Sequence, residues 1–230
     1  MDLKSFLRRI VAQAGYEIRK SPPARLWKDD PDFKSVLGAI RGHTLVGPER
    51  CFMLWQFARS AAMAPGDFAE LGVYRGGTAL LLARATQHSG RKLHLFDTFA
   101  GLPASDAIRD EGRTQDFSDT SVEAVQNYLR GFDNVELHAG LFPDSAAPVA
   151  NRRFSFVHAD ADIYSSMKAC CEFFYPRLSP GGFLVCDDYA MEAWPGATAA
   201  IDEFFSSKPE RLWRFATGQC VIQRSLGHEG

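Results

Sequence analysis

The chain has 230 residues, of which 46% are hydrophobic and 23% are charged, and its formal net charge at pH 7 is -2. This size and composition are typical of one globular α/β domain with appendages, and they exclude a disordered chain. Acidic and basic residues are interspersed, without the basic stripe that is typical of nucleic-acid binders, so we expect no nucleic-acid partner.

The sequence also predicts where the protein works. No apolar run approaches the roughly 20 residues that a membrane span needs, and residues 1–20 carry charges every few positions, unlike a signal peptide. The five cysteines form no CxxC pair, and their odd number favours reduced thiols. We therefore expect a cytoplasmic protein with no membrane partner.

Residues 1–43 are predicted to form a helical arm or lid in front of a main domain at 44–230. Residues 1–20 have the pattern of a short amphipathic helix, and the three prolines in residues 21–33 indicate a linker. Such an arm could exchange between the subunits of a homo-oligomer, and the sequence leaves the oligomeric state open. Helical spacing then returns over residues 47–63, which end in the turn "APGD".

From Asp67 onward, strand-like and helix-like segments alternate. The strands are predicted over residues 67–73, 92–97, 134–140, 154–160 and 181–188. The helices between and after them are predicted over residues 76–90, 120–132, 165–178 and 197–207. This alternation indicates a parallel, doubly wound sheet with helices on both faces.

The C-terminal segment 211–224 contains two β-rich runs around the short turn "TGQ". Two strands joined so tightly must be antiparallel, because a parallel crossover needs a dozen or more residues. We therefore expect an α/β fold with a doubly wound, mostly parallel seven-stranded sheet and one antiparallel C-terminal strand. This Rossmann-like pattern is that of class I S-adenosylmethionine methyltransferases.

The first strand–helix turn, "AELGVYRGGT", has the features of a ligand-binding turn. Gly72 suits a tight turn, and Gly76 and Gly77 open a helix whose N-terminal amides would face a ligand. Tyr74, however, stands where a dinucleotide site needs its second glycine, so the pattern counts against NAD.

Two acidic residues end the first two strands. Glu70 would repel a phosphate but suits the ammonium group of a methionine moiety, and Asp97 is placed to accept hydrogen bonds from a ribose diol. The alternative is a generic glycine turn beside a surface acid. Together with the turn, the two acids favour an S-adenosylmethionine site.

Two further strands each run into a pair of acids, Asp160 with Asp162 and Asp187 with Asp188. These strands are central in the expected topology, so Asp160, Asp187 and Asp188 should meet at the rim of the sheet. Crowded carboxylates raise one another's pKa unless a cation neutralises them. Oxygen ligands favour Mg²⁺, with Ca²⁺ or Mn²⁺ as alternatives; one or two of the acids could instead be caps or surface groups.

Asp162 is a candidate general base. Strand alternation would place it on the same side as Asp160, but if the chain leaves the strand there, Asp162 faces the substrate. It would then take the proton from a hydroxyl group that the metal has made more acidic.

These segments together resemble the macrocin O-methyltransferase (TylF-type) family of Mg²⁺- and S-adenosylmethionine-dependent sugar O-methyltransferases. The resemblance runs from about Thr44 to Phe205, in the stretches "TLVGPERCFMLWQFARSA", "GDFAELGVYRGGT", "LFDTFAGLP", "HADADIYSS", "SPGGFLVCDDY" and "PGATAAIDEFF". It implies methyl transfer to a hydroxyl group of a small molecule, a sugar of a glycosylated natural product.

The resemblance also assigns roles to residues. It implies Asp160, Asp187 and Asp188 as metal ligands and Asp162 as the base. The residues that it and the glycine turn place at the cofactor are Glu70, Gly72, Tyr74, Gly76, Gly77, Thr78, Asp97 and Thr98.

Several other residues have weaker signals. His158 could touch the acid cluster, although a strand histidine is more often packed and hydrogen-bonded, and His43 is a candidate lid residue. Tyr164 and Tyr189 flank the acids and could line an acceptor pocket or pack in the core. The long polar segment 103–121, with residues 21–43, is a candidate lid, because loops of this length are commonly functional. Trp194 lies on a loop near the acids.

Three rival functions remain at this level. The first is a glycosyltransferase whose DxD motif grips a nucleotide-sugar diphosphate, which leaves Glu70 and the glycine turn unexplained. The second is a catechol-type O-methyltransferase, although the lysine base common in such enzymes is missing beside Asp160. The third is a binding protein on a decayed enzyme scaffold, but retention of all four acids argues against it. A dehalogenase-type phosphatase would carry its DxD motif after the first strand, not the fourth.

Overall fold

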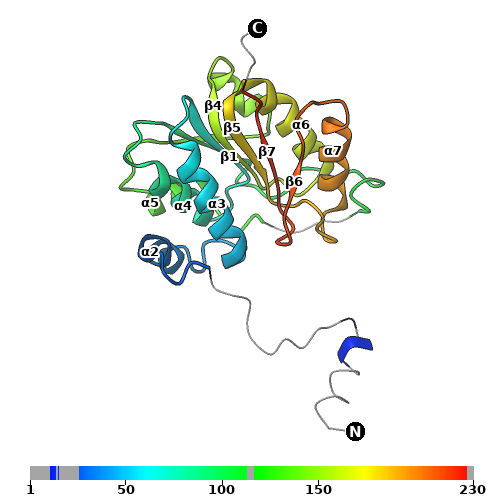
Figure 1. The fold of residues 1–230 in the computed structure, drawn as a ribbon, viewed down its shortest axis with the longest axis horizontal. Helices are drawn as coiled ribbons and strands as arrows, with labels where there is room; N and C mark the ends of the chain where they lie inside the picture. The colour runs from blue at the N-terminus through cyan, green and yellow to red at the C-terminus, as the bar shows by residue number, and fades with distance from the viewer. Residues whose placement is uncertain (1–10, 14, 16–25, 113–116, 227–230) are drawn as a thin grey trace.

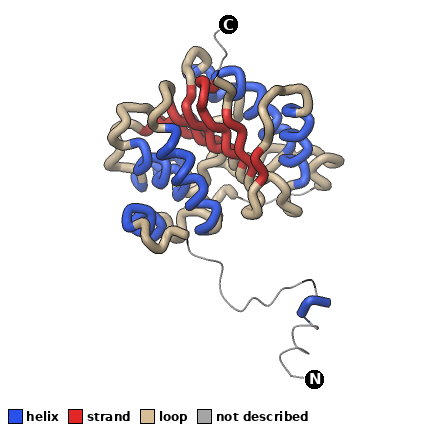
Figure 2. Tube along the Cα trace, viewed as in Figure 1, coloured by secondary structure: helices blue, strands red, loops and turns tan. Residues whose placement is uncertain are grey.

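The computed structural model describes residues 11–13, 15, 26–112 and 117–226. Residues 26–112 and 117–226 form a twisted central sheet with helices on both faces (Figures 1 and 2). The helix expected over residues 1–20 lies almost wholly outside the described residues. Among the helices that the structure does describe, none is both long and apolar enough to cross a membrane.

The sheet has seven strands in the order β3-β2-β1-β4-β5-β7-β6. From β3 to β5 every neighbouring pair is parallel, whereas β7 runs antiparallel to both of its neighbours. The predicted fold class is therefore confirmed. The strand bounds are β1 (Asp67–Leu71), β2 (Leu93–Asp97), β3 (Val135–Ala139), β4 (Phe154–Ala159), β5 (Leu178–Cys186), β6 (Trp213–Arg214) and β7 (Cys220–Gln223).

Two helical layers cover the sheet, and each encloses its own hydrophobic cluster. Strand alternation divides the core: Leu93 and Leu95 of β2 pack into the cluster on one face, and Phe96 packs into the cluster on the other. The first cluster lies under α2 (Pro31–Ala39), α3 (Pro48–Ala61), α4 (Gly77–Thr86) and α5 (Val122–Tyr128). The second lies under α6 (Tyr164–Phe174) and α7 (Pro195–Phe205), with the short 3₁₀ turns η1 (Asp144–Val149) and η2 (Tyr175–Arg177).

Helix α2 was not expected, because its prolines indicated a linker over residues 21–33. Pro31 instead occupies the first turn of the helix, where its missing N–H costs nothing, and the side chain of Asp30 caps the helix by accepting from the N–H of Phe33 at 2.8 Å. Phe33 is fully buried and lies edge-on to Phe52 of α3. This part of the N-terminal segment is therefore packed onto the sheet's helical layer.

The connection from β3 to β4 carries only the short η1 turn instead of a full crossover helix. Strand β3 is also the edge strand of the sheet, and its residues from Val135 to His138 are only partly buried, whereas Leu93–Phe96 of β2 are buried. One face of this edge is consequently open.

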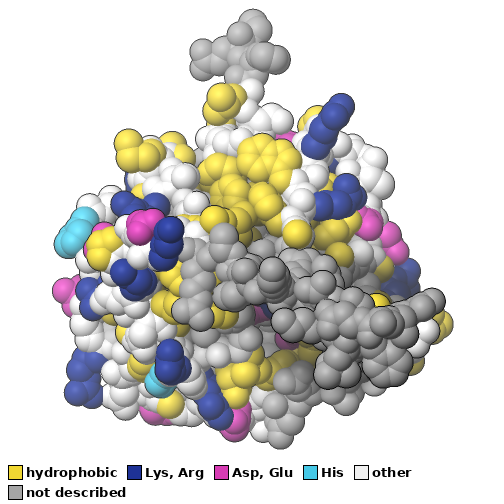
Figure 3. Space-filling view, turned by 60° about the horizontal axis from the view of Figure 1, so that its bottom comes forward, with side chains coloured by type: hydrophobic (Ala, Val, Ile, Leu, Met, Phe, Trp, Pro, Cys, Tyr) yellow, Lys and Arg dark blue, Asp and Glu magenta, His cyan; other side chains and the backbone are white. Residues whose placement is uncertain are grey.

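The mixed charge of the surface and the free thiols are those that the composition predicts. On the face drawn in Figure 3, basic side chains lie among acidic, hydrophobic and uncharged ones. All five cysteines are free and buried, as expected for reduced thiols.

Candidate active site

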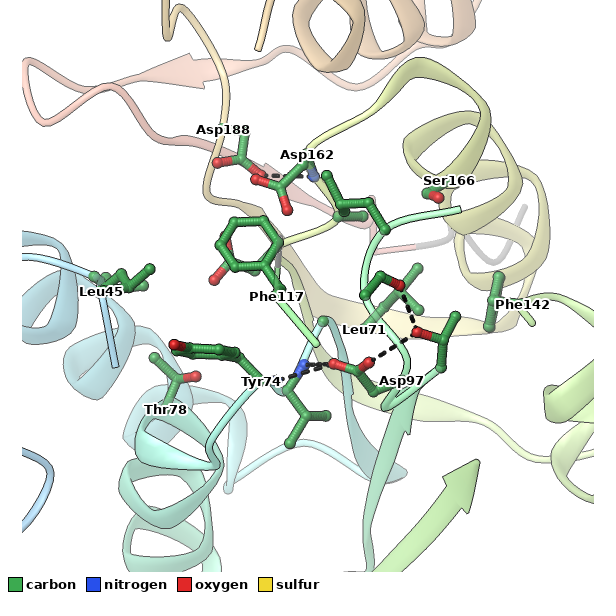
Figure 4. A pocket seen from close by; sticks show the side chains of 18 of the residues that line it. Leu45, Leu71, Tyr74, Thr78, Asp97, Phe117, Phe142, Asp162, Ser166 and Asp188 are labelled. Carbon is green, nitrogen blue, oxygen red and sulfur yellow. Dashed lines mark hydrogen bonds between the residues drawn. The ribbon is translucent and has the colours of Figure 1, made fainter. Parts of the chain in front are cut away.

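A pocket of about 290 Å³ lies at the carboxyl ends of the parallel strands, where the strand order reverses between β1 and β4. Ligands of open α/β sheets bind at this kind of position. Eight of the twelve predicted site residues line the pocket: Gly72, Tyr74, Thr78, Asp97, Thr98, Asp160, Asp162 and Asp188. Figure 4 shows Tyr74, Thr78, Asp97, Asp162 and Asp188 among them. The other four, Glu70, Gly76, Gly77 and Asp187, are not among the lining residues.

The turn after β1 is fixed by a close approach to β4. A Cβ atom on Gly72 would lie 1.8 Å from the carbonyl oxygen of Asp160, and the φ of Gly72 is +88°. The N–H of Asp160 also donates to the carbonyl of Leu71 at 2.9 Å. Only glycine fits here, so the cofactor turn and the first acid of the cluster are held against each other.

The next two glycines make backbone hydrogen bonds within the chain. Gly76 is the left-handed N-cap of α4, and its N–H donates to the carbonyl of Val73 at 2.9 Å. The N–H of Gly77 donates to the carbonyl of His43 at 2.9 Å, and a Cβ atom on Gly77 would lie 2.7 Å from that residue's backbone. The chain itself uses these two N–H groups, and contact of the other N-terminal amides of α4 with a ligand stays a prediction.

Asp97 lines the pocket and organises the turn above it. One carboxylate oxygen accepts from the N–H groups of Val73 at 2.7 Å and Tyr74 at 2.9 Å (Figure 4). The other accepts from the N–H of Phe99 at 2.8 Å. A carboxylate has about four lone-pair sites, so acceptor capacity is left for a ligand. The hydroxyl of neighbouring Thr98 donates to the carbonyl of Gly101 at 2.6 Å.

Glu70 is not among the residues that line the pocket, and its expected contact with a methionine ammonium group stays a prediction. The residue is fully buried, and one carboxylate oxygen contacts Nδ1 of His158 at 2.8 Å. Strands β1 and β4 pair with Glu70 directly opposite His158, so the two side chains share one face of the sheet. Glu70 therefore acts in this structure on a neighbouring histidine.

His158 links Glu70 to the acid cluster. Its Nε2 atom lies 3.6 Å from an oxygen of Asp187, too far for a hydrogen bond but within ion-pair distance. Burial opposes the charged imidazole, yet the contacts with Asp187 and Glu70 outweigh it and raise the pKa of His158 to about 10. The imidazolium is thus a fixed positive charge beneath the acids.

Asp187 is the best-compensated acid of the cluster. One oxygen accepts from Nε2 of Gln219 at 2.6 Å, and the other forms a close ion pair with the guanidinium of Arg50 from α3. Although burial opposes ionisation, the nearby His158 and Arg50 lower the pKa of Asp187. This aspartate is therefore charged in the folded protein.

The other three acids are poorly compensated. Burial, and then the charges of the neighbouring aspartates, raise the pKa of Asp160 and of Asp162 well above the usual value. The same two causes raise the pKa of Asp188 to about 6. Asp188 accepts from the backbone N–H of Asp162 at 3.1 Å and lies 3.7 Å from the guanidinium of Arg50 (Figure 4). Such a cluster attracts a cation.

Two of the predicted metal ligands lie close together. Ligand atoms of Asp160 and Asp187 lie within 4.8 Å of each other and of His158, which in its charged form is an ion-pair partner of Asp187. Asp188 is outside that group and is held by Arg50 and Asp162. Carboxylate oxygens with raised pKa values suit a hard divalent cation, so these side chains fit a metal site. Asp187 and Asp188 would then contact both the cation and Arg50.

Sequence reasoning missed Arg50. It lies in the quoted segment "TLVGPER", but no local pattern indicates that it reaches an aspartate 137 residues away. The sequence did indicate that four neighbouring acids need positive charge close by, but we interpreted this need as a metal ion and not as an arginine.

The residues with weaker signals divide between the pocket and its surroundings. His43 lines the pocket and stacks on Tyr128 at 3.8 Å between ring centroids. Trp194 also lines it, whereas Tyr164 donates to Glu203 at 2.6 Å and Tyr189 is buried beside Asp202, both outside the lining.

The candidate lid reaches the pocket from both of its described ends. Pro103 and Phe117 line the pocket, and Phe117 lies edge-on to Tyr74. The hydroxyl of Thr120 donates to the carbonyl of Tyr74 at 2.6 Å. Residues 113–116 lie outside the described residues, and a lid role for this segment stays a prediction.

The known proteins to which the chain is similar are named as O-methyltransferases. The family model described as Macrocin-O-methyltransferase (TylF) matches residues 24–209. The chain is 32% identical over 168 residues to the 8-demethyl-8-(2,3-dimethoxy-alpha-L-rhamnosyl)-tetracenomycin-C 4'-O-methyltransferase of Streptomyces olivaceus, covering 66% of this chain and 64% of that protein. It is 29% identical over 183 residues to the Mycinamicin III 3''-O-methyltransferase of Micromonospora griseorubida, covering 70% of each.

Solved structures share the same fold. The O-methyltransferase NovP superposes with a TM-score of 0.69 at 27% identity, covering 80% of this chain and 82% of that chain. The calicheamicin methyltransferase CalS11 superposes with a TM-score of 0.63 at 17% identity, covering 90% and 94%, and at that identity the likeness speaks for the fold alone.

Proposed function

Because the chain belongs to the macrocin O-methyltransferase (TylF) family, we propose that it transfers the methyl group of S-adenosylmethionine to a hydroxyl group of a sugar on a small natural product. The two curated relatives described above are named as methyltransferases of glycosylated compounds, and this supports a glycoside acceptor. The chain spans 64% of the first relative's length. The observation that carries the proposal is the acid cluster, which lies beside a pocket built on a glycine turn at the switch point of the sheet.

The rival functions lack comparable support. A glycosyltransferase would not belong to this family, and its DxD reading leaves the glycine turn unexplained. A catechol-type enzyme would share the fold, but the family and the named relatives act in natural-product and sugar methylation.

When bound, S-adenosylmethionine supplies an electrophilic methyl group on a sulfonium, and a divalent cation held by Asp160, Asp187 and Asp188 lowers the pKa of a nearby hydroxyl group. The residues present fit both groups: a glycine-lined pocket with Asp97 at its edge, and carboxylates whose raised pKa values reveal unneutralised charge. We infer Mg²⁺ as the cation, because all the proposed ligand atoms are oxygens.

In the proposed reaction, Asp162 accepts the proton of the acceptor hydroxyl while the new oxygen–carbon bond forms and the carbon–sulfur bond breaks. The products are a methyl ether, S-adenosylhomocysteine and one proton on the carboxylate. Asp162 lines the pocket, and this position supports its role as the base. The backbone N–H that it donates to Asp188 fixes its position.

The chain's other lining residues would position the reactants. Apolar side chains of Leu71, Phe117 and Trp194 line the pocket and would exclude water from the sulfonium. We also propose a cytoplasmic location, which the free and buried cysteines support.

A methyl-transfer assay with mass-spectrometric detection tests the proposal. Purified protein would be incubated with S-adenosylmethionine and, separately, deoxysugar glycosides, a nucleotide sugar and a catechol, each with Mg²⁺ or with a chelator. We expect a product heavier by one methylene with a glycoside, together with stoichiometric S-adenosylhomocysteine, and loss of that product with the chelator. Methylation of the catechol alone, or glycosyl transfer from the nucleotide sugar, would overturn the proposed acceptor or the reaction itself.

Asp162→Asn should lower the methylation rate about 10²- to 10⁴-fold, the usual contribution of a general base. Binding of S-adenosylmethionine, measured by calorimetry, should stay within a factor of about three. Asp144→Asn, at an exposed position of η1, is the matched control and should leave the rate unchanged. A rate near that of the unmodified protein in Asp162→Asn would assign the proton to another group.

A further inference from the structure

A second group of metal-ligating side chains lies on the neighbouring strands β2 and β3. His94 of β2 pairs with Glu136 of β3, and the next same-face pair places Phe96 beside His138. Ligand atoms of His94, Glu136 and His138 all lie within 4.8 Å of one another. None of these residues belongs to the pocket described above.

Two of the three distances within this group are close to those between the ligands of a tetrahedral ion, and the third is within 4.8 Å. Nδ1 of His94 lies 3.1 Å from Nε2 of His138 and 3.4 Å from Oε2 of Glu136. Ligand atoms about 2.0–2.1 Å from a tetrahedral Zn²⁺ are separated by about 3.3 Å. The side chains therefore need little movement to hold an ion.

The contacts of His94 orient its ring toward the other two ligands. Its Nε2 atom faces a carboxylate oxygen of Asp67 at 3.4 Å, and its Nδ1 atom faces Nε2 of His138 and Oε2 of Glu136. The residue is 1% exposed, so its neighbours hold the ring in this orientation.

We propose that Nδ1 of His94, Nε2 of His138 and Oε2 of Glu136 form a binding site for a transition-metal dication, Zn²⁺ being the best suited. An ion there accepts the lone pairs of both rings and of Glu136, and it leaves the remaining N–H of His94 to donate to Asp67. A carboxylate that holds the second nitrogen of a ligating histidine is the usual outer partner of such a ligand. The site is separate from the proposed catalytic function and does not depend on it.

The surroundings make the site accessible. The side chain of Glu136 is 42% exposed, and Glu136 and His138 line an open groove along β3. The η1 turn leaves this face of the edge strand without a crossover helix, so water can occupy the fourth position. Lys92 contacts the other oxygen of Glu136 at 3.2 Å and leaves Oε2 available.

The ion would fasten the edge strand. Two nitrogen ligands favour Zn²⁺ over Mg²⁺, whereas the oxygen-only acid cluster at the pocket favours Mg²⁺. The two sites can therefore be told apart by the ion that each prefers. Bound metal would tie β3 to β2, and through Asp67 to β1.

Metal titration of the full, tag-free chain tests the site. In millimolar Mg²⁺, which saturates oxygen sites, the protein would be titrated with Co²⁺ and then with Zn²⁺ against a chromogenic chelator. We expect one equivalent of Zn²⁺ to bind, and the Co²⁺ form to show the intense visible absorption of tetrahedral coordination. His138→Gln and Glu136→Gln, both at half-exposed positions, should each weaken binding at least tenfold. Asp67→Asn should weaken it about 10- to 100-fold.

Two controls make the outcome decisive. His88→Gln removes an exposed histidine from outside the group, and Asp160→Asn alters the acid cluster at the pocket; neither should change Zn²⁺ affinity. Circular dichroism of the metal-free variants would establish that each is folded. Absence of Zn²⁺ binding in Mg²⁺, equal affinity in His138→Gln, or loss of binding in Asp160→Asn would each overturn the site.

Discussion

At the scale of single residues, the acid cluster is defined by how its charge is neutralised. Arg50 and His158 place two positive charges against four aspartates, and the guanidinium of Arg50 contacts Asp187 and Asp188. The protein can therefore fold with part of the cluster's charge neutralised by its own side chains.

Arg50→Gln should lower the free energy of unfolding by about 3 kcal/mol in a chelator, because it leaves buried Asp187 without its closest partner. Added Mg²⁺ should recover more stability in this variant than in the unmodified protein, since binding to the folded state is stabilising. Urea unfolding with and without Mg²⁺ measures both effects.

Arg59→Gln on the same helix is the matched control. Its side chain is 54% exposed and its ion pair with Asp30 spans 3.9 Å, so we expect a change within about 0.5 kcal/mol. If Mg²⁺ stabilised the Arg50 variant and the unmodified protein equally, the aspartates that contact Arg50 would not also bind Mg²⁺.

At the scale of elements, the start of α4 is joined to the N-terminal segment. Gly77 donates to the carbonyl of His43, and His43 and Thr44 both line the pocket. The packing of residues 43–44 against α4 thus shapes one wall of the site.

Gly77→Ala should destabilise the fold by about 1–3 kcal/mol, because its Cβ atom would lie 2.7 Å from the backbone of His43 and must displace it. Calorimetry should show weaker binding of S-adenosylmethionine, since the displaced backbone belongs to the pocket wall.

Gly38→Ala in α2 is the control, because no atom lies within 4 Å of the position of its Cβ. We expect it to stabilise the protein by about 0.5–1 kcal/mol through helix propensity. Equal effects of the two substitutions would show that contact with His43 is unimportant.

The elements also show what the sequence could reveal. Periodicity and turn length predicted the strands of the sheet and the reversed strand β7, because these signals are local. Helix α2 was missed because Pro31 reads as a breaker unless the cap formed by Asp30 is recognised. The pairing of Glu70 with His158 could not be predicted, since it depends on which strands are neighbours and in what register.

At the scale of the whole molecule, Glu210 ties the C-terminal part of the sheet to the layer of α6. It accepts from the hydroxyl of Tyr175 at 2.5 Å, from the guanidinium of Arg224 at 2.9 Å and from the N–H of Ser225 at 3.3 Å. Burial opposes its ionisation, but the hydrogen bonds from Tyr175 and Ser225 outweigh it and lower its pKa.

The lowered pKa of Glu210 determines how its contribution to folding stability changes with pH. The stabilisation by Glu210 is fully present above its unfolded pKa of 4.5, and it is lost as the pH falls through the lower folded value. Glu210→Gln should therefore cost about 1.5–3 kcal/mol at pH 7 and less at acidic pH. Urea unfolding between neutral and acidic pH would show the two stability curves converging.

Glu192→Gln, at an exposed position, is the control and should leave the free energy of unfolding unchanged at every pH. A constant gap between Glu210→Gln and the unmodified protein at all pH values would mean that the charge of Glu210 is not involved.

The contact between Gly72 and the carbonyl of Asp160 has a consequence for how such proteins diverge. The clash that forbids any larger residue at position 72 is with the backbone of position 160, and the aspartate side chain takes no part in its closest approach. A descendant could therefore lose the acid, and its chemistry, while selection for folding alone still kept the glycine. Retention of this glycine in a diverged sequence would report ancestry, and only the aspartates would report whether the enzyme still works.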